Sequence, residues 1–176
     1  IRYRSVSRGL GDVYKRQVAG GIDACLKVTD VVASQRLVYH DVWCGDGNEY
    51  GQVQGFPASY EGCPSLLKHA LSLNEAGMES RIHSGLVCTG DQFITNRTEL
   101  DTIKQRFPDG LAVDMESAAI AQTCYLYNVP FLSFRIISDT PGVEDHASQY
   151  ADFWGTMAER SFLTIWTFLS TLPSNL

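Results

Sequence analysis

Hydrophobic residues follow two alternating periodicities along this chain. Short runs rich in β-branched residues predict strands at residues 30–39, 81–89, 111–113 and 131–137. Apolar residues at helical spacing predict helices at residues 66–76, 98–107 and 116–126, and an amphipathic C-terminal helix from Tyr150 to Leu172. Strands that alternate with helices are typical of an α/β domain, in which helices pack on a largely parallel sheet.

The length of 176 residues suits one domain, and neither an internal repeat nor a low-complexity linker divides the chain after residue 17. The hydrophobic fraction of 44% predicts a folded protein. Its net charge of −6 argues against nucleic acid as a partner, because such proteins neutralise phosphates with basic residues. An apolar run long enough to span a membrane is absent from the sequence.

The five cysteines are odd in number and scattered, without a metal-ligand or redox spacing, at positions Cys25, Cys44, Cys63, Cys88 and Cys124. We expect free, buried thiols and a cytoplasmic protein, because a reducing compartment preserves free thiols. The four histidines lack ligand spacing, so we predict neither a metal site nor a cofactor.

The first 17 residues differ from the rest of the chain. They hold five basic residues and one acidic residue, whereas the remainder holds nine basic and nineteen acidic residues. They also lack a sustained periodicity. We therefore predict a disordered or non-native leader at residues 1–17 and one incomplete α/β domain at residues 18–176.

Candidate chemistry follows the predicted strands, because ligands in open α/β sheets bind beyond the carboxyl ends of the strands. Ser138-Asp139 and Asp114-Met115-Glu116 place carboxylates there, although turns and helix starts are the commoner use of such residues. Gly20-Gly21 is predicted as a turn that allows backbone to approach a ligand. The glycine patterns of dinucleotide and phosphate-binding loops are absent, as is the serine-hydrolase elbow.

Five blocks in order, VAGGID, VVAS…YHD…EYGQ, TGDQFI, AVDMESAAIA and FRIISD, together resemble the 5′-methylthioadenosine/S-adenosylhomocysteine nucleosidases of the nucleoside phosphorylase family. The resemblance runs from Val18 to about Leu172. It implies a mixed α/β sheet flanked by helices and the hydrolysis of an N-glycosidic bond, with adenine as a product. The AVDMESAAIA and SD blocks carry it most strongly.

The resemblance also implies a role for each matching residue. Asp139 would protonate adenine at N7, with Ser138 orienting it, and Glu116 would accept hydrogen bonds from the ribose hydroxyls. A general acid makes chemical sense here, because expelling adenine as an anion is difficult. Further binding residues are implied around the base and the sugar, namely Ala19, Gly20, Phe93, Ile94, Asp114, Met115, Arg135 and Tyr150.

Two more implications concern the whole protein. Residues 39–50 correspond to a segment that reaches the neighbouring subunit's pocket in family members, so a homodimer is expected. Family members also begin with strands, one of which carries the residue that activates water, and residues 1–17 match none of them. We expect a chain without these first strands, with exposed sheet edge and apolar surface, and the water-activating residue stays unassigned.

Two alternative functions remain open. A purine nucleoside phosphorylase would use phosphate in place of water, and it would need basic or hydroxyl groups beside the glycines, where Val18 offers neither. A nucleoside-binding module without turnover would bind adenine and release no product. The sequence leaves the preferred 5′ substituent of the nucleoside undecided, and Asp114 stands where the family often has a longer Glu.

Overall fold

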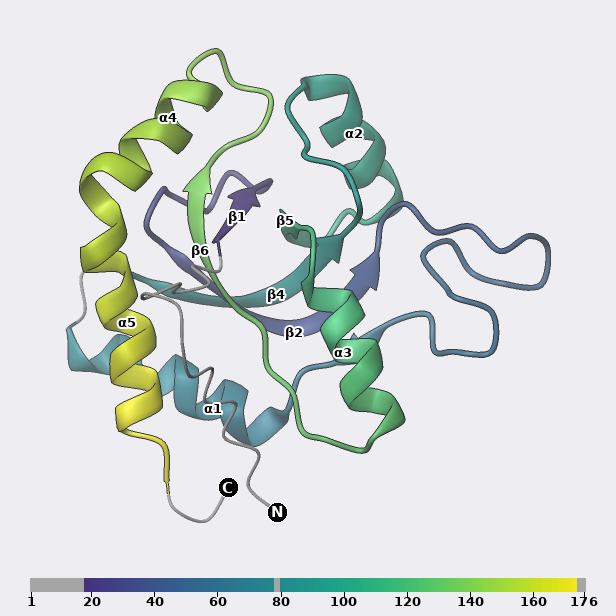
Figure 1. Ribbon diagram of the computed structural model, residues 1–176, viewed down its shortest axis with the longest axis horizontal. Helices are drawn as coiled ribbons and strands as arrows, with labels where there is room; N and C mark the ends of the chain where they lie inside the picture. The colour runs from purple at the N-terminus through teal and green to yellow at the C-terminus, as the bar shows by residue number, and fades with distance from the viewer. Residues whose placement is uncertain (1–17, 78–79, 174–176) are drawn as a thin grey trace, which may run out of the picture.

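The computed structural model describes residues 18–77 and 80–173, which form a mixed sheet surrounded by helices (Figure 1). The predicted leader at residues 1–17 lies outside the described residues. The strands are β1 (Val18–Gly21), β2 (Val31–Tyr39), β3 (Tyr60–Glu61), β4 (Ile82–Thr89), β5 (Gly110–Asp114) and β6 (Phe134–Asp139). The α-helices are α1 (Pro64–Ser72), α2 (Arg97–Arg106), α3 (Ser117–Leu126), α4 (His146–Asp152) and α5 (Ala158–Ser170).

The sheet has the strand order β3-β2-β4-β5-β1-β6, and a further ladder between β2 and β6 closes five of these strands into a ring. The β2–β4, β4–β5 and β1–β6 ladders are parallel, whereas β1–β5, β2–β3 and β2–β6 are antiparallel. The longest ladder, β2–β4, is parallel. The prediction of a mixed α/β sheet is therefore confirmed.

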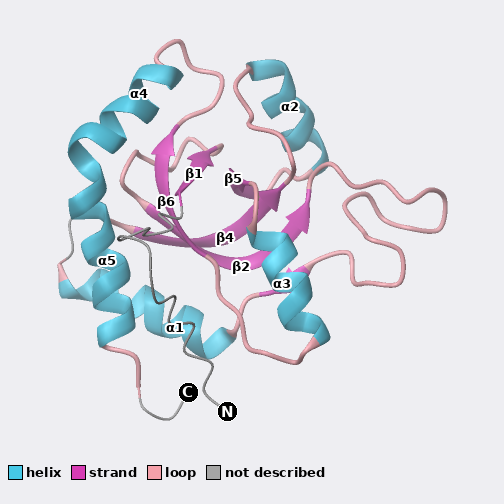
Figure 2. Cartoon of the chain, in the orientation of Figure 1, coloured by secondary structure: helices cyan, strands magenta, loops and turns pink. Residues whose placement is uncertain are grey.

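Alternation along β2 distributes its side chains between two layers. Val31 and Ala33 pack with α1 and α5, whereas Val32 packs with the small residues Ala118 and Ala121 of α3. Helix α2 covers a third cluster around β4 and β5 (Figure 2). Helices thus surround the sheet, as the alternation of periodicities predicted, and leave the strand ends for the pocket described below.

Two predicted boundaries at the strand ends are wrong. Gly20 and Gly21 belong to β1 and not to a turn, because Gly20 pairs with Val113 on β5 and with Asp139 on β6. Ser138 and Asp139 are the last two residues of β6, whereas the sequence predicts that this strand ends at residue 137. Both shifts follow from the ring, since a neighbouring strand extends the ladder past the point where the apolar run ends.

Strand β6 begins at Phe134, three residues later than the sequence predicts. The residues before it bond elsewhere: the Cys63 amide donates to the Phe131 carbonyl at 2.7 Å, and the Ser133 amide donates to the Ser34 hydroxyl at 2.8 Å. These backbone groups therefore form hydrogen bonds outside a strand ladder, and the hydrophobic run alone does not predict this.

The predicted C-terminal helix is present, with a one-turn π-helix at Phe153–Met157 between α4 and α5. Helix α4 begins at His146, four residues before the prediction, and α5 ends at Ser170. Phe153 and Phe168 are buried, as the amphipathic pattern requires. The side chains of Met157 and Ser161, which belong to that pattern, lie outside the described side chains.

All five cysteines are free, but only Cys88 is buried, so the prediction of buried thiols is wrong for the others. Burial raises the pKa of the Cys88 thiol to about 12. Among the described residues, no helix is long and apolar enough to span a membrane.

Candidate active site

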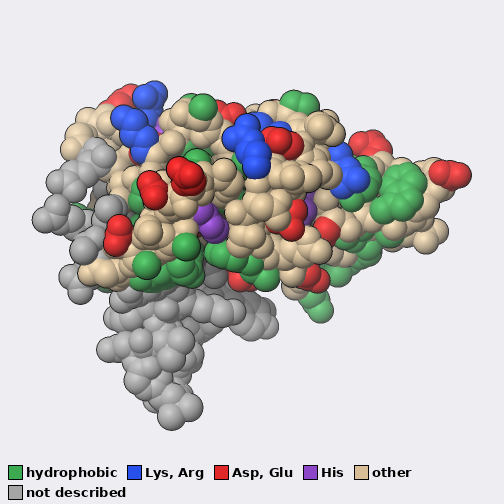
Figure 3. All heavy atoms as spheres, turned by 90° about the horizontal axis from the view of Figure 1, so that it is seen from above, with side chains coloured by type: hydrophobic (Ala, Val, Ile, Leu, Met, Phe, Trp, Pro, Cys, Tyr) green, Lys and Arg blue, Asp and Glu red, His purple; other side chains and the backbone are tan. Residues whose placement is uncertain are grey.

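A cavity of about 250 Å³ opens where β1, β5 and β6 end. Its lining comes from these strands, from residues 92–94 after β4, and from α4 and the turn that follows it. Figure 3 looks onto the molecule from the side toward which β1 and β6 point in Figure 1. All of the binding and catalytic residues expected from the sequence line this one cavity: Ala19, Gly20, Phe93, Ile94, Asp114, Met115, Glu116, Arg135, Ser138, Asp139 and Tyr150.

Asp139 is 2% exposed, and both of its carboxyl oxygens have partners. The Ser138 hydroxyl donates to Oδ1 at 2.5 Å, and His146 Nε2 lies 2.7 Å from Oδ2. Burial raises the pKa of Asp139, and this effect outweighs the hydrogen bond from Ser138 and the imidazole of His146, which both lower the pKa. The site therefore favours a protonated carboxyl group, which is a proton donor, at the floor of the cavity.

Arg135 lies beneath the cavity with 2% exposure, in β6. Its Nε is 2.6 Å from Asp114 Oδ2, and its Nη1 is 3.2 Å from Glu116 Oε2. Its Nη2 is buried and has no hydrogen-bond partner among the described residues. This guanidinium therefore holds Glu116, whose side chain is 51% exposed, and keeps one donor available to a ligand.

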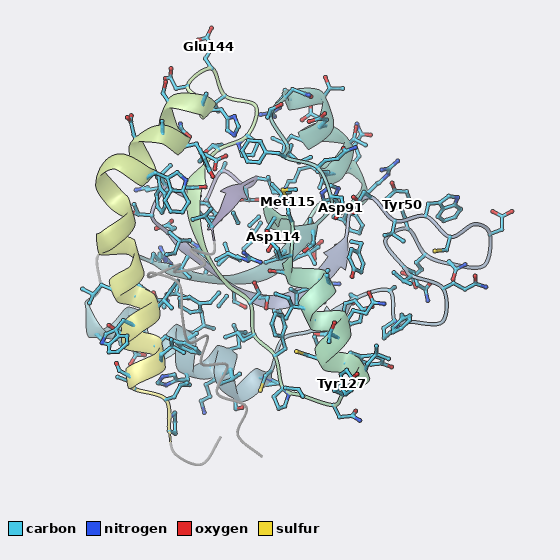
Figure 4. All side chains as sticks on the ribbon, viewed as in Figure 1. Tyr50, Asp91, Asp114, Met115, Tyr127 and Glu144 are labelled. Atoms are coloured by element: carbon cyan, nitrogen blue, oxygen red, sulfur yellow. The ribbon has the colours of Figure 1, made fainter. Side chains whose placement is uncertain are left out.

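Asp114 is enclosed by protein donors, although it lines the cavity. Thr89 donates to Oδ1 at 2.6 Å, and both the Ser117 hydroxyl and Arg135 contact Oδ2. Figure 4 shows Asp114 and Met115 near the centre of the molecule, where β5 ends and before α3 begins. The carboxylate therefore anchors Arg135, and its oxygens are occupied by protein donors.

An aromatic wall closes one side of the cavity. The Phe93 ring is 55% exposed and packs edge-on to Tyr150 at a centroid distance of 5.8 Å. Tyr150 in turn meets Trp154 edge-on at 6.0 Å. Ile94, next to Phe93, is buried in the cluster under α2. A flat heterocycle against Phe93 would find an apolar face there and polar groups at Asp139.

The backbone of β1 forms the opposite wall, where Gly20 allows a close approach. A Cβ at this position would lie 2.7 Å from Cγ of Pro141 and 3.2 Å from Val113. Ala19 is buried, and Met115, just after β5, is 42% exposed at the rim. Glycine is needed here for packing between β1 and the loop after β6, which differs from the turn expected from the sequence.

Sequence reasoning missed several residues of this site, namely Gln92, Pro141, His146 and Trp154. His146 stands eight residues after Ser138, and spacing within a loop gives no sign that the imidazole would fold back onto the acid. Trp154 belongs to the amphipathic pattern of the C-terminal helix, and that pattern does not distinguish a core residue from one that lines a cavity. Among residues 18–77 and 80–173, no group of three or more His, Cys, Asp or Glu side chains could hold a metal ion.

The segment between β2 and β3 projects from the body of the molecule (Figures 1 and 3). Trp43 stacks on Tyr50 at a centroid distance of 6.1 Å, and the Arg106 guanidinium lies 3.8 Å from the Tyr50 ring centroid. Figure 4 shows Tyr50 on this segment, away from the cavity. Within one protomer this part of the chain is therefore remote from Asp139.

A family model described as the phosphorylase superfamily matches residues 18–170, nearly all of the described chain. The chain belongs to the phosphorylase superfamily. The resemblance noted in the sequence is thereby confirmed at the level of the family, and the closed mixed sheet is this superfamily member's scaffold. The strand ends at which the cavity lies come from the same matched region.

Individual relatives of this chain indicate a narrower class of protein than the superfamily does. This superfamily member is 45% identical over 131 residues to a 5′-methylthioadenosine/S-adenosylhomocysteine nucleosidase of Chromohalobacter salexigens, covering 74% of the chain and 56% of the relative. Nucleosidases of the same name from Colwellia psychrerythraea, in complex with adenine, and Neisseria meningitidis, in complex with methylthio-immucillin-A, are 33% and 32% identical, each with a TM-score of 0.82. The alignments cover 92% and 89% of this chain and 67% and 68% of those chains.

Proposed function

We propose that the protein carrying this chain hydrolyses the N-glycosidic bond of 5′-methylthioadenosine and S-adenosylhomocysteine and releases adenine. The chain spans 56% of its Chromohalobacter relative, so the activity is proposed for the protein as a whole. The relatives' names and the bound adenine and nucleoside analogue support the substrate class. One observation on this chain carries the proposal: a buried carboxyl group with a raised pKa in a cavity bordered by an exposed aromatic ring.

Asp139 is the general acid in this proposal. Adenine is a poor leaving group as an anion, and a proton delivered to N7 lets it leave as a neutral molecule. Burial in β6 raises the pKa of the acid and so shifts it toward the protonated form, and the Ser138 hydroxyl donates to one carboxyl oxygen from the adjacent position. A positioned general acid of this kind contributes about 10²–10⁴-fold to a rate.

Glu116 and Arg135 act on the sugar. The Glu116 carboxylate reaches the cavity with half of its side chain exposed, so it can accept hydrogen bonds from ribose hydroxyls. Its negative charge also favours the oxocarbenium-like sugar that develops as the bond breaks. Arg135 fixes this carboxylate, and its unpaired Nη2 adds a donor for a sugar oxygen.

The remaining residues position the base and the sugar. Phe93 offers its exposed face to the purine, the backbone at Ile94 contacts the purine edge, and Tyr150 supports the Phe93 ring. Ala19 and Gly20 approach the ribose and base from β1, and Met115 lines the sugar at the rim. The water-activating residue is not assigned to any of the described residues.

The test is adenine release from methylthioadenosine in phosphate-free buffer. We would compare this chain, the chain joined to a family-like N-terminal region, and Asp139→Asn in the active form. Adenine release that falls about 10²–10⁴-fold in Asp139→Asn supports the proposal. Release that requires phosphate would instead indicate a phosphorylase, and adenine binding without product in every form would indicate a binding module.

The proposal extends to assembly and location. A homodimer is supported by apolar side chains exposed beside the projecting segment: Tyr125, Tyr127 and Val129 are 54%, 75% and 53% exposed at and beyond the end of α3, and Trp43 is 54% exposed. The Phe56 and Tyr125 rings, 6.5 Å apart, join the two regions. Five free cysteines support a cytoplasmic protein, where removal of methylthioadenosine would serve methionine salvage.

A further inference from the structure

His146 contacts the proposed acid directly, although the reaction as described gives it no task. Its Nε2 lies 2.7 Å from Asp139 Oδ2, and the two side chains are 10% and 3% exposed. Ser138 occupies the other carboxyl oxygen. The imidazole is therefore the only titratable side chain that the described structure places within hydrogen-bond distance of the group that loses a proton.

The fold holds this imidazole from several sides. His146 is the first residue of α4, and its amide donates to the Val143 carbonyl at 3.2 Å. Its ring lies against Phe93 at a centroid distance of 5.7 Å. The Thr140 amide donates to the Gln149 side chain at 2.9 Å, which ties the loop after β6 to α4. Figure 4 shows Glu144 at the outer end of that loop, pointing away from the cavity.

An imidazole in this position can do what Ser138 cannot. Once Asp139 has given its proton to the purine, the buried carboxylate must regain one before the next turnover. A hydroxyl group can only donate a hydrogen bond to it, whereas an imidazolium can transfer its Nε2 proton to the carboxylate, remain neutral with its second proton on Nδ1, and be protonated again afterwards. A protonated Nε2 returns its proton to Oδ2, and the neutral imidazole then takes up a proton from solvent.

We propose that His146 is a positioning residue that acts through Asp139, orienting its carboxyl group and returning the proton that the leaving purine removes. The inference rests on the proposed function. Each turnover then moves one proton from His146 to Asp139 and one from Asp139 to N7, and solvent restores the imidazolium. Because His146 also touches Phe93, the acid and the aromatic face that receives the purine are set by the same side chain.

The chain contains a matched pair for comparison. His83 Nε2 lies 3.0 Å from Asp30 Oδ2, with side chains 14% and 12% exposed, and neither residue lines the cavity. A substitution there disturbs an equivalent contact without touching the site. His83→Gln is therefore the control for the general effect of breaking a buried His–Asp contact.

The first experiment measures adenine release by the active protein with His146→Ala, His146→Gln and His83→Gln. We expect His146→Ala to lower kcat about 10–100-fold, somewhat less than the full effect of a general acid, and to change KM by a smaller factor through its contact with Phe93. Added imidazole should restore the rate of His146→Ala in proportion to its concentration. His146→Gln should keep a low kcat, because an amide cannot supply a proton, and His83→Gln should match the parent with or without imidazole.

The second experiment needs no turnover. Calorimetry of adenine binding in buffers of different ionisation enthalpy gives the number of protons taken up. The number of protons taken up on binding should differ between the parent and His146→Ala, because the substitution removes the imidazole that contacts Asp139. An unchanged kcat in His146→Ala, a loss that imidazole leaves untouched, or equal proton uptake would overturn the inference. If the parent releases adenine, any of these results overturns the inference and leaves the proposed function intact. If the parent fails to bind adenine, both the inference and the proposed function are overturned.

Discussion

At the scale of single residues, the two carboxylates near Arg135 have different tasks because their surroundings differ. Asp114 is 6% exposed, and its oxygens are taken by Thr89, Ser117 and Arg135. The Glu116 side chain is half exposed and, among the described residues, forms an ion pair with Arg135. The DME motif places both acids at the end of one strand, but only the solvated one keeps lone pairs for a ligand.

Replacing Asp114 tests this interior role. Asp114→Asn should lower the free energy of unfolding by about 3–5 kcal/mol, because it leaves the buried Arg135 guanidinium without its nearest countercharge. Urea denaturation measures the loss. The control is Asp101→Asn, which breaks the exposed i,i+4 pair with Arg97 and should cost at most about 0.5 kcal/mol. Equal losses in both variants would contradict an anchoring role.

Asp139 predicts a pH dependence of stability. Its pKa in the folded protein lies above the ordinary value of 3.8, so the folded state favours the protonated form. Stability from this group is therefore greatest at low pH and is lost as the pH rises from the ordinary pKa through the raised one. Asp139→Asn cannot ionise, so it avoids this loss of stability. It should raise Tm at pH 7.5 by about 2–4 °C for each kcal/mol gained in the free energy of unfolding.

The measurement is Tm by circular dichroism at pH 5 and pH 7.5. The gain of Asp139→Asn over the parent should be larger at pH 7.5, where the parent bears the cost of a buried charge. Asp46→Asn, on the exposed projecting segment, should show no pH-dependent difference from the parent. A gain that grows toward low pH would have the wrong sign for a raised pKa.

At the scale of elements, the site depends on β1 fitting between β5 and β6. Its parallel ladder with β6 and its antiparallel ladder with β5 bring Ala19 and Gly20 beside Asp139. Helix α3 then begins directly after Glu116, and its small residues Ala118 and Ala121 let it approach the sheet closely. The acid, the sugar-binding carboxylate and the backbone wall therefore meet through strand pairing.

Gly20→Ala tests how tightly these elements fit. The added Cβ would lie 2.7 Å from Pro141, so the loop after β6 must shift at the cavity wall. We expect a stability loss of about 1–3 kcal/mol, typical of overpacking, together with an increased KM for the nucleoside. Gly155→Ala is the control, because a Cβ there meets nothing within 4 Å. A parent-like KM in Gly20→Ala would show that the loop adapts freely.

At the scale of the whole molecule, exposed apolar side chains gather in two places. One comprises the end of α3 and the projecting segment, with Tyr127 at the outer end of the helix (Figure 4). The other lies on α5, where Leu163, Trp166 and Leu169 are 61%, 67% and 55% exposed. The proposed homodimer uses the first, because the projecting segment there extends beyond its own protomer's body (Figure 1).

Tyr127→Asp should therefore convert the proposed dimer to a monomer, since it places a charge in an apolar contact. Light scattering coupled to size-exclusion chromatography gives the mass of each form directly. Trp166→Asp, a change of the same kind on α5, should leave the dimer intact. Loss of the dimer in Trp166→Asp alone would move the interface to the other apolar surface.

The sequence by itself determined most of the element types and eleven of the residues that line the site. Periodicity located β2, β4 and the helices within a few residues, because alternating burial on a sheet and on a helix leaves distinct hydrophobic patterns. The site residues followed from five collinear blocks in a family resemblance, and all of them border one cavity. Periodicity alone favoured turn and cap roles for Ser138-Asp139 and Glu116.

Only the tertiary structure decided which contacts, and therefore which role, each of those residues has. Contacts between residues distant in sequence made Gly20 part of a strand, enclosed Asp114 with Thr89 and Arg135, and folded His146 back onto Asp139. Burial of Asp139, and hence the direction of its pKa shift, also arises from neighbours contributed by several elements. Local sequence encodes periodicity, whereas desolvation and hydrogen-bond partners depend on which strands lie side by side.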